Sequence, residues 1–389
     1  MNVYVVSAVR TPIGKYGKSF INTPAVELGK IAVDEAIKRA GINKNIVDEV
    51  IMGNALQCGL GQNPARQVSL KSSFPNTINA FTVNMVCGSG LKAITLGAQA
   101  IKAGDADIIV AGGMENMSQA PYYVKNVRFG LKYDKTTFYD EMIMDGLWDV
   151  YYNVHMIKTG EVIAEKYNLT RKEIDEFAYR SHYNAKRARD NGRFAKEIVP
   201  VKTESGEIKN DEGIRDDTSV EKLQSLKPVL KDGKFVTAGN ASQLSDGASA
   251  VVLMSEKSLN EYGIKPMAKI IAYNTVGVDP LYVMEAPIPG TKALLEKTGM
   301  KIDDLDIFEH NEAYASASVA VKKALNIDDE IFNINGGAVA LGHPIGASGA
   351  RVLTTLLYNL IEKKGKFGLE TICLGGGNAV SILVENLVR

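Results

Sequence analysis

Apolar residues recur at two spacings along this chain of 389 residues. Short runs rich in apolar and β-branched residues, such as "AFTVNMV" (80–86), predict buried strands. Segments with apolar residues at every third or fourth position, such as "GLKAITLGAQAIKAG" (90–104), predict helices that end at a glycine. Because strands and helices alternate, the pattern predicts an α/β fold with largely parallel sheets and ligand sites beyond the carboxyl ends of the strands.

A helix–glycine–strand unit occurs twice in the chain at a constant separation. The segments "GINKNIVDEVIMGNAL" (41–56) and "GMKIDDLDIFEHNEAY" (299–314) each follow a helical pattern. The pairs separated by 258 positions are Gly41 and Gly299, Asp48 and Asp306, and Ala55 and Ala313. Two looser matches follow in the same order, "AFTVNMV" with "EIFNING" (330–336) and "DIIVAGGMENMS" (107–118) with "TICLGGGNAVS" (371–381). Three matches in the same order along the chain predict two copies of one α/β domain.

The segment between the two copies differs from them in composition. It is charged and tyrosine-rich; residues 170–194 predict a solvated helix, and residues 201–217 predict an exposed loop region. The predicted organisation is an N-terminal half over 1–120 that is completed by about 237–262, an inserted loop domain over 121–236, and a C-terminal half over 263–389. Long insertions of this kind commonly carry substrate recognition.

Composition and charge narrow the classes of partner. The 45 Lys and Arg residues balance 45 Asp and Glu residues, so no general positive field attracts nucleic acid or an acidic membrane. The N-terminus has no basic region followed by a long apolar run, and no stretch reaches the roughly 18 apolar residues of a membrane span, which predicts a cytoplasmic protein. Three cysteines and four histidines lack disulfide-framework or metal-ligand spacing, which predicts reduced thiols and no metal site.

One cysteine lies where a nucleophile is expected. Cys87 falls between the predicted strand 80–86 and the predicted helix 90–104. Unpaired N–H groups and the dipole at a helix N-terminus stabilise a thiolate, so this position predicts a reactive thiol. The alternative is a small apolar residue that fills the core.

Four further candidates follow other predicted strands. His343 lies in the glycine-rich stretch 336–350, and Cys373 lies two residues before Gly375, whose N–H is available to an oxygen. Asn311 carries an amide that suits a water or a carbonyl oxygen. The alternatives are a core histidine, a buried thiol at a strand end and a helix cap. All four are predicted to lie at carboxyl ends of strands, as Cys87 does.

The motifs together resemble the thiolase family over essentially the whole chain. They are "VNMVCGSGLKAI", "GGMENMSQAPY", "DGLWD", "TAGNASQLSDGA", "HNEAYA", "NINGGAVALGHPIGASGA" and "CLGGGNAV", and they occur in the order and approximate spacing of that family. The acetyl-transferring members are the most similar. The resemblance implies a thiolase-like fold, with two repeated α/β domains, mixed and largely parallel sheets, and an inserted loop domain.

The resemblance assigns a role to each candidate of the catalytic set. It implies that Cys87 is the acylated nucleophile, that His343 is its activating base, and that Cys373 is the acid and base at the α-carbon. Asn311 is implied to hold a water in an oxyanion hole, and the N–H groups of Gly375 and Cys87 are implied to face the oxygen of the acyl-enzyme.

The resemblance also implies residues that bind coenzyme A. Arg215 is placed at the nucleotide end, Ser242 and His155 along the pantetheine, and Met156 at the end of the acyl pocket, which it shortens. The alternatives for the first three are an exposed charge, a turn serine and a packed ring. Ile157 stands where a glycine is usual, so the chain-length preference stays open.

The implied function is that of an acyl-CoA C-acyltransferase. It is the reversible Claisen condensation of two acetyl-CoA to acetoacetyl-CoA and CoA, or thiolytic cleavage of a 3-ketoacyl-CoA, by a ping-pong acyl-cysteine mechanism. The implied partners are acyl-CoA thioesters and CoA, in a homo-oligomer, a dimer or tetramer, with no separate cofactor, nucleic acid or membrane. Alternatives are a 3-ketoacyl-CoA thiolase of broader chain length, a β-ketoacyl synthase, for which the sequence lacks an N-x-H-G-T motif, and a non-catalytic CoA-binding subunit.

Overall fold

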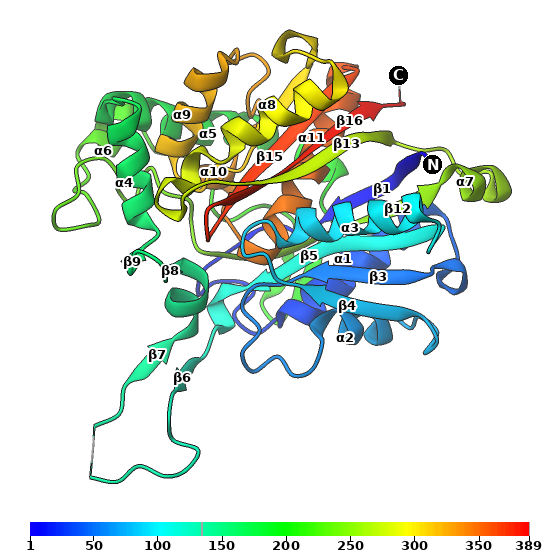
Figure 1. Ribbon diagram of the computed structural model, residues 1–389, viewed down its shortest axis with the longest axis horizontal. Helices are drawn as coiled ribbons and strands as arrows, with labels where there is room; N and C mark the ends of the chain where they lie inside the picture. Colours follow the sequence, from blue (N-terminus) through cyan, green and yellow to red (C-terminus); the bar gives the residue numbers. More distant parts are fainter. Residues whose placement is uncertain (134, 389) are drawn as a thin grey trace.

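A ten-stranded mixed sheet runs through the protein (Figure 1). The computed structural model describes residues 1–133 and 135–388. In spatial order the strands of the main path are β14 (Ile307–His310), β15 (Phe367–Leu374), β16 (Asn378–Asn386), β13 (Ala268–Gly277), β1 (Val3–Arg10), β12 (Ser245–Ser255), β5 (Ile108–Asn116), β3 (Glu49–Gly53) and β4 (Asn79–Val83). The short strand β2 (Gly14–Lys15) pairs with β12. The predicted α/β class is confirmed.

Most neighbouring strands in this sheet are antiparallel, so the expectation of largely parallel pairing was wrong. In the N-terminal half β1, β3, β4 and β5 share one direction, but the reversed strand β12 lies between β1 and β5. In the C-terminal half β13, β14 and β15 share one direction, and the reversed strand β16 lies between β13 and β15. Alternating strands and helices indicate that strands joined by a helix run in the same direction. They do not show that the last strand of each half, β12 or β16, runs in the opposite direction and lies between two of the others.

Helices cover both faces of the two halves. Helices α3 (Ser89–Ala103) and α11 (Ser348–Lys363) contact each other and strands of both halves. On the opposite face of the N-terminal half lie α1 (Ala25–Ala40) and α2 (Pro64–Lys71), and α8 (Pro287–Thr298) packs on β13, β15 and β16. Successive side chains of β3 point to opposite faces of the sheet. Val50 and Met52 belong to the core under α1, whereas Ile51 belongs to the core around α3 and α11.

Helices α3 and α11 approach closely near their N-termini because glycines face the neighbouring helix. A Cβ added to Gly90 would lie 3.0 Å from the backbone nitrogen of Ala350, and one added to Gly349 would lie 2.6 Å from the Cβ of Leu91. Any side chain at these two positions would therefore separate the helices. The close approach brings the segments that precede the two helices, which contain Cys87 and His343, to the same region.

The predicted repeat is confirmed in its first unit, down to individual contacts. Gly41 and Gly299 end α1 and α8 in the left-handed conformation, with φ angles of 68° and 67°. Asp48 accepts hydrogen bonds from the N–H of the first residue of β5 and of the residue before it, and Asp306 accepts the corresponding pair at the start of β15. In this unit the two copies therefore share these contacts as well as the order of their elements.

The two looser matches of the repeat need correction. The predicted strand 330–336 forms only an isolated parallel bridge between Phe308 and Phe332, and residues 80–86 correspond to the strand β4. The match of 107–118 with 371–381 pairs the correct strands, β5 and β15, in the wrong register. Gly112 lies within β5, whereas Gly375 lies in the turn after β15. Glycine-rich composition misled the alignment because it does not distinguish a strand interior from a turn.

The chain leaves the sheet after β5 and rejoins it at β12. The intervening strands are β6 (Tyr122–Val124), β7 (Phe138–Asp140), β8 (Trp148–Asp149), β9 (Val154–His155), β10 (Val201–Thr203) and β11 (Gly206–Ile208), and the helices are α4 (Ile157–Lys166), α5 (Arg171–Asp190) and α6 (Val220–Gln224). Helix α5 starts with a capping box of Thr170 and Glu173. It buries one face, which includes Phe177, so the prediction of a solvated helix was wrong for that face.

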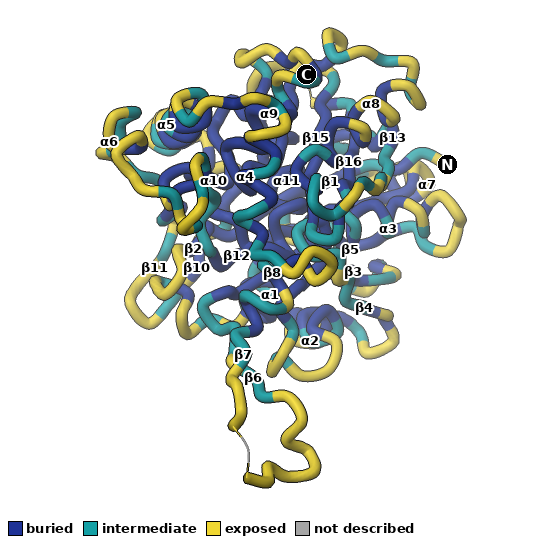
Figure 2. Tube along the Cα trace, turned by 60° about the vertical axis from the view of Figure 1, so that its left-hand side comes forward, coloured by how far each residue is buried: buried dark blue, intermediate teal, exposed yellow. Residues whose placement is uncertain are grey.

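The remaining helices are α7 (Glu256–Tyr262), α9 (Ala315–Leu325) and α10 (Ala338–Leu341). The hairpin of β6 and β7 extends away from the body of the protein and is largely exposed (Figure 2). Among the described residues, every helix is too short or too polar to cross a membrane.

Candidate active site

A small cavity of about 40 Å³ collects most of the residues that the sequence singled out. Cys87, His343, Cys373 and Gly375 all line it, although they come from both halves of the sheet. The other lining residues are Gly146, Leu147, Met156, Ser242, Val283, Met284, Ala313, Tyr314 and Leu374. Two thiols, one imidazole and a mainly apolar wall therefore meet at one place.

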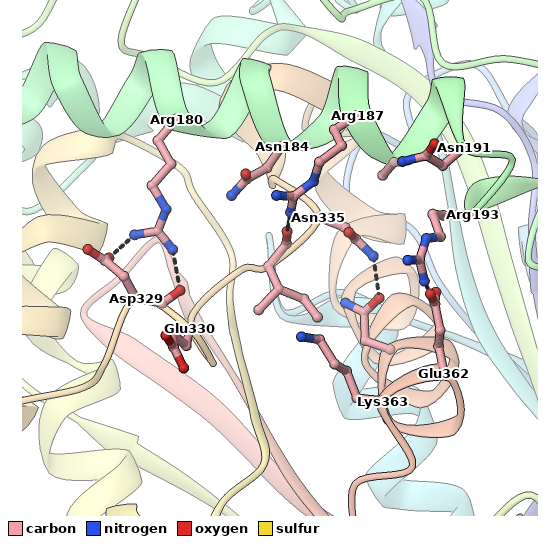
Figure 3. Close-up of a pocket in the computed structure, with 13 residues that line it drawn as sticks. Arg180, Asn184, Arg187, Asn191, Arg193, Asp329, Glu330, Asn335, Glu362 and Lys363 are labelled. Atoms are coloured by element: carbon pink, nitrogen blue, oxygen red, sulfur yellow. Dashed lines mark hydrogen bonds and ion pairs between the residues drawn. The ribbon is translucent and has the colours of Figure 1, made fainter.

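A larger cavity lies elsewhere and is polar (Figure 3). It measures about 690 Å³ and lies between α5, the segment near Asp329 and the end of α11. Arg180 is paired with Asp329 and Arg193 with Glu362, so acidic neighbours balance much of its positive charge. It contains none of the predicted site residues, and the chemistry belongs to the smaller cavity.

Cys87 sits in a turn between β4 and α3, as predicted from the sequence, and the structure shows that this turn is strained. The preceding residue, Val86, has a φ of 47°, which is an outlier for a β-branched side chain and costs on the order of 1–3 kcal/mol. The Ser89 hydroxyl secures the turn, because it accepts the Met85 N–H at 2.8 Å and donates to the Val86 carbonyl at 2.6 Å. The strain is consistent with a site that fixes the direction of the thiol.

The protonation state expected for Cys87 was wrong. The helix N-terminus predicted a stabilised thiolate, but burial in the apolar cavity and the nearby Cys373 raise the pKa of the Cys87 thiol above its ordinary value. The backbone N–H of Gly375 acts on the Cys87 sulfur and lowers this pKa by a smaller amount. Cys87 therefore rests as a thiol, and it could act as a nucleophile only after a base takes its proton.

His343 is held as the tautomer that can act as that base. The Ser348 hydroxyl donates to the Pro344 carbonyl at 2.8 Å, so its oxygen accepts the Nδ1–H of His343 at 2.5 Å. Nε2 then carries the lone pair, and it has no hydrogen-bond partner in the described part of the chain. Burial and Arg351 lower the pKa of His343 to about 3, so the ring is neutral at physiological pH.

Cys373 is the second thiol of the cavity. It is the penultimate residue of β15 and is buried, which raises the pKa of its thiol to about 12. Its sulfur lies 3.8 Å from the Met284 sulfur. Burial disfavours the charged thiolate, so Cys373 keeps its proton in the resting cavity.

Asn311 follows β14 and is fully buried. Neither its side-chain oxygen nor its side-chain nitrogen has a hydrogen-bond partner among residues 1–133 and 135–388. A buried amide without partners is costly, so this side chain suits a bound oxygen atom. It is not among the residues that directly line the small cavity.

The predicted CoA-binding residues divide into two groups. Ser242 and Met156 line the cavity. Arg215 is half-buried outside it and donates to the Ala238 carbonyl at 3.0 Å, beside the segment that leads to Ser242. His155 is also outside it, and its Nδ1 accepts the Ile157 N–H at 3.1 Å.

Sequence reasoning missed several residues of the site. Tyr314 and Met284 line the cavity, and Ser348 orients His343. Ser348 lies in the same glycine-rich motif as His343, five residues further on, and this spacing at the start of a helix was the available signal. Met284 had none, because its position depends on how the segment before α8 folds over β15.

Comparison with known proteins identifies the family. The model of the thiolase N-terminal domain matches residues 3–257, and that of the thiolase C-terminal domain matches residues 264–386. The acetyl-CoA acetyltransferase of Syntrophomonas wolfei is 48% identical over 99% of this chain and 99% of its own.

Solved structures agree with these matches. Human mitochondrial 3-ketoacyl-CoA thiolase in complex with CoA is 38% identical, with a TM-score of 0.97 over 99% of this chain and 98% of its own. The Bacillus anthracis acetyl-CoA acetyltransferase is 40% identical, with a TM-score of 0.96 over 99% of each chain.

The family models cover nearly the whole chain, and the acetyltransferase of S. wolfei matches it from end to end. The chain belongs to the thiolase family. It is an enzyme of the acyltransferase type.

Proposed function

We propose that this protein joins two acetyl-CoA molecules to form acetoacetyl-CoA and CoA, and catalyses the reverse thiolytic cleavage, through an acyl group on Cys87. One observation carries the proposal: two thiols and a neutral imidazole line a single cavity. Carbon–carbon bond formation between two thioesters needs one group to hold the acyl chain and another to move the α-proton. A single thiol would not supply both.

In the first half-reaction the Cys87 sulfur attacks the thioester carbonyl while its proton passes to Nε2 of His343. The bond between the carbonyl carbon and the CoA sulfur breaks, and the departing CoA thiolate takes the proton of Cys373. The N–H groups of Cys87 and Gly375 stabilise the carbonyl oxygen as its charge develops. The products are acyl-Cys87, CoA, an imidazolium at His343 and a thiolate at Cys373.

In the second half-reaction the Cys373 thiolate removes an α-proton from a second acetyl-CoA. The enolate oxygen is held by the imidazolium of His343 and by a water on the Asn311 amide, and its carbon attacks acyl-Cys87. The Cys87 sulfur is expelled and recovers its proton from His343. Every proton is then back at its starting group, and the enzyme is regenerated.

Chain-length preference is the first test of this function. The cavity has room for only a few water-sized groups, and Met156 and Met284 lie in its wall, which favours a short acyl group. In thiolysis assays with free CoA, kcat/KM is expected to fall about 10-fold or more from acetoacetyl-CoA to 3-ketooctanoyl-CoA. Met156→Ala is expected to narrow this difference because it enlarges the wall.

Equal kcat/KM values for the two substrates in the wild-type protein would contradict the short-chain proposal. They would favour the alternative, a 3-ketoacyl-CoA thiolase of broader chain length. Complete inactivity with every 3-ketoacyl-CoA would contradict both.

We further propose that Arg215 binds the phosphates of the nucleotide end of CoA and that Ser242 and His155 lie along the pantetheine. Because the chain has no net charge, attraction of the anionic CoA must be local. Arg215→Ala is expected to raise KM for CoA about 10-fold and to change kcat less than about 2-fold, as when uniform binding is lost. Steady-state thiolysis kinetics measure both constants.

Lys209→Ala is the matched control, since it removes an exposed cation of the same insertion that is paired with Glu207. It is expected to leave both constants unchanged. If Arg215→Ala raised KM equally for CoA and for CoA lacking its 3′-phosphate, the contact would not involve that phosphate. An unchanged KM for CoA would remove Arg215 from the site.

The proposal includes a cytoplasmic homo-oligomer with no cofactor besides CoA as substrate and product, and the domain division at 120, 236 and 262. Two features support self-association. Within residues 1–133 and 135–388, strand β4 ends the sheet with one edge unpaired, and the hairpin of β6 and β7 exposes Tyr122, Phe129 and Phe138 to solvent. Sedimentation of the purified protein tests whether it is a dimer or a tetramer.

A further inference from the structure

A buried carboxylate joins two loops behind the candidate active site. Glu115 is the penultimate residue of β5 and is fully buried. Its Oε1 accepts the Asn54 side-chain amide at 2.6 Å and the Leu56 N–H at 3.2 Å. Its Oε2 accepts the N–H groups of Ala55 at 3.1 Å and Gly346 at 2.8 Å. All four of these partners are donors, as an ionised carboxylate requires.

The two loops belong to different halves of the protein. Residues 54–56 follow β3 in the N-terminal half, and Gly346 lies three residues after His343 in the C-terminal half. A Cβ added to Gly346 would lie 2.7 Å from the Asn54 Cα and 2.9 Å from the Ala55 nitrogen. The loops are thus in backbone contact, and the carboxylate of Glu115 bonds to both of them at this contact.

The same N-terminal loop also holds the turn that carries the nucleophile. The Asn84 side chain donates to the Ala55 carbonyl at 3.2 Å and accepts the Val86 N–H at 3.0 Å. A continuous set of hydrogen bonds therefore runs from Gly346, through Glu115 and Ala55, to the residue before Cys87.

We propose that Glu115 is a positioning residue that fixes the His343 loop relative to the Cys87 turn. This inference rests on the proposed function, in which His343 takes the Cys87 proton. Proton transfer depends steeply on this geometry, and a misplacement of about 1 Å costs roughly 100-fold in rate.

The chemistry of the surroundings explains why the residue is a carboxylate. Burial raises the pKa of Glu115, whereas the N–H groups of Gly346, Ala55 and Leu56 lower it and favour the ionised form. An ionised group in this position therefore depends on these hydrogen bonds. A neutral amide of the same shape would turn one of the two acceptors into a donor that faces N–H groups, and it would push one of the loops away.

Glu115→Gln is the test, with Glu161→Gln as the matched control. Glu161 is also a buried carboxylate that accepts backbone N–H groups, those of Lys234, Phe235 and Val236, and it lies outside the cavity. Both variants are expected to lower Tm. Only Glu115→Gln is expected to lower kcat, by about 10- to 100-fold, with KM for the acyl-CoA within about 3-fold of wild type.

The rate of acetylation of Cys87, followed by intact-protein mass spectrometry, is expected to fall with kcat in Glu115→Gln. Asn54→Ala removes one neutral donor to Glu115 and keeps the carboxylate. It is expected to lower kcat about 3-fold or more, and it tests the positioning role if Glu115→Gln does not fold. A folded Glu115→Gln or Asn54→Ala protein with wild-type kcat and acetylation rate would overturn the inference. A wild-type protein that forms no adduct on Cys87 would instead overturn the proposed function.

Discussion

Replacing Cys87 with serine is expected to abolish turnover, with kcat falling by about 10⁴-fold or more, as when one member of a coupled catalytic set is removed. Burial lowers the pKa of His343, so its ring is a weak base. A serine hydroxyl is a weaker acid than a thiol in the same surroundings, so it gives its proton to this base less readily. Initial rates of thiolysis measure the loss. Intact-protein mass spectrometry after exposure to acetyl-CoA is expected to show an acetyl group on wild-type protein and none on Cys87→Ser.

Cys58→Ser is the control for this experiment, because Cys58 is an exposed thiol outside the cavity. It is expected to be acetylated and to turn over like wild type. Peptide mapping that located the adduct on Cys373 or Cys58 would contradict the assignment of the nucleophile.

Replacing Cys373 with alanine is expected to separate the two half-reactions. Acyl transfer to Cys87 needs His343 and the N–H donors, and a CoA thiolate is a stable enough leaving group to depart without the Cys373 proton. Condensation needs a base at the α-carbon, and loss of such a base typically costs about 10²- to 10⁴-fold. The variant is therefore expected to acquire an acetyl group while acetoacetyl-CoA formation falls by that factor.

Exchange of the methyl protons of acetyl-CoA with deuterated solvent gives an independent measurement of the second step. Wild type is expected to catalyse this exchange and Cys373→Ala to lose it. Met284→Leu, which keeps an apolar side chain beside the same position, serves as the control for altered packing. A Cys373→Ala protein that condensed at nearly the wild-type rate would show that another group removes the proton.

The sequence was sufficient to predict features that depend on local pattern. The helix–glycine–strand unit was visible because Gly41 and Gly299 both require a left-handed conformation and because Asp48 and Asp306 have the same contacts. The turn that carries Cys87 followed from a change of hydrophobic period. The residues brought together in the cavity were predictable from their positions after strands, once an α/β fold was assumed.

Features that depend on the whole fold were not predictable in this way. The reversed strands β12 and β16 insert between strands that are distant in sequence, so the alternation of elements does not show them. The raised pKa of Cys87 results from burial by both halves, which outweighs the helix N-terminus considered alone. Glu115 lies in a strand of nine buried residues, and its role depends on a contact with Gly346, which is 231 positions away.

The crossing of α3 and α11 at Gly90 and Gly349 limits how alike the two copies can be. The helices are matching elements of the two copies, and the turns before them carry the thiol of Cys87 in one copy and the imidazole of His343 in the other. Two identical halves related by symmetry would bring two thiols or two imidazoles to this crossing, and never one of each. A thiol paired with an imidazole at this crossing therefore requires two halves of different sequence, and neither half alone contains the pair.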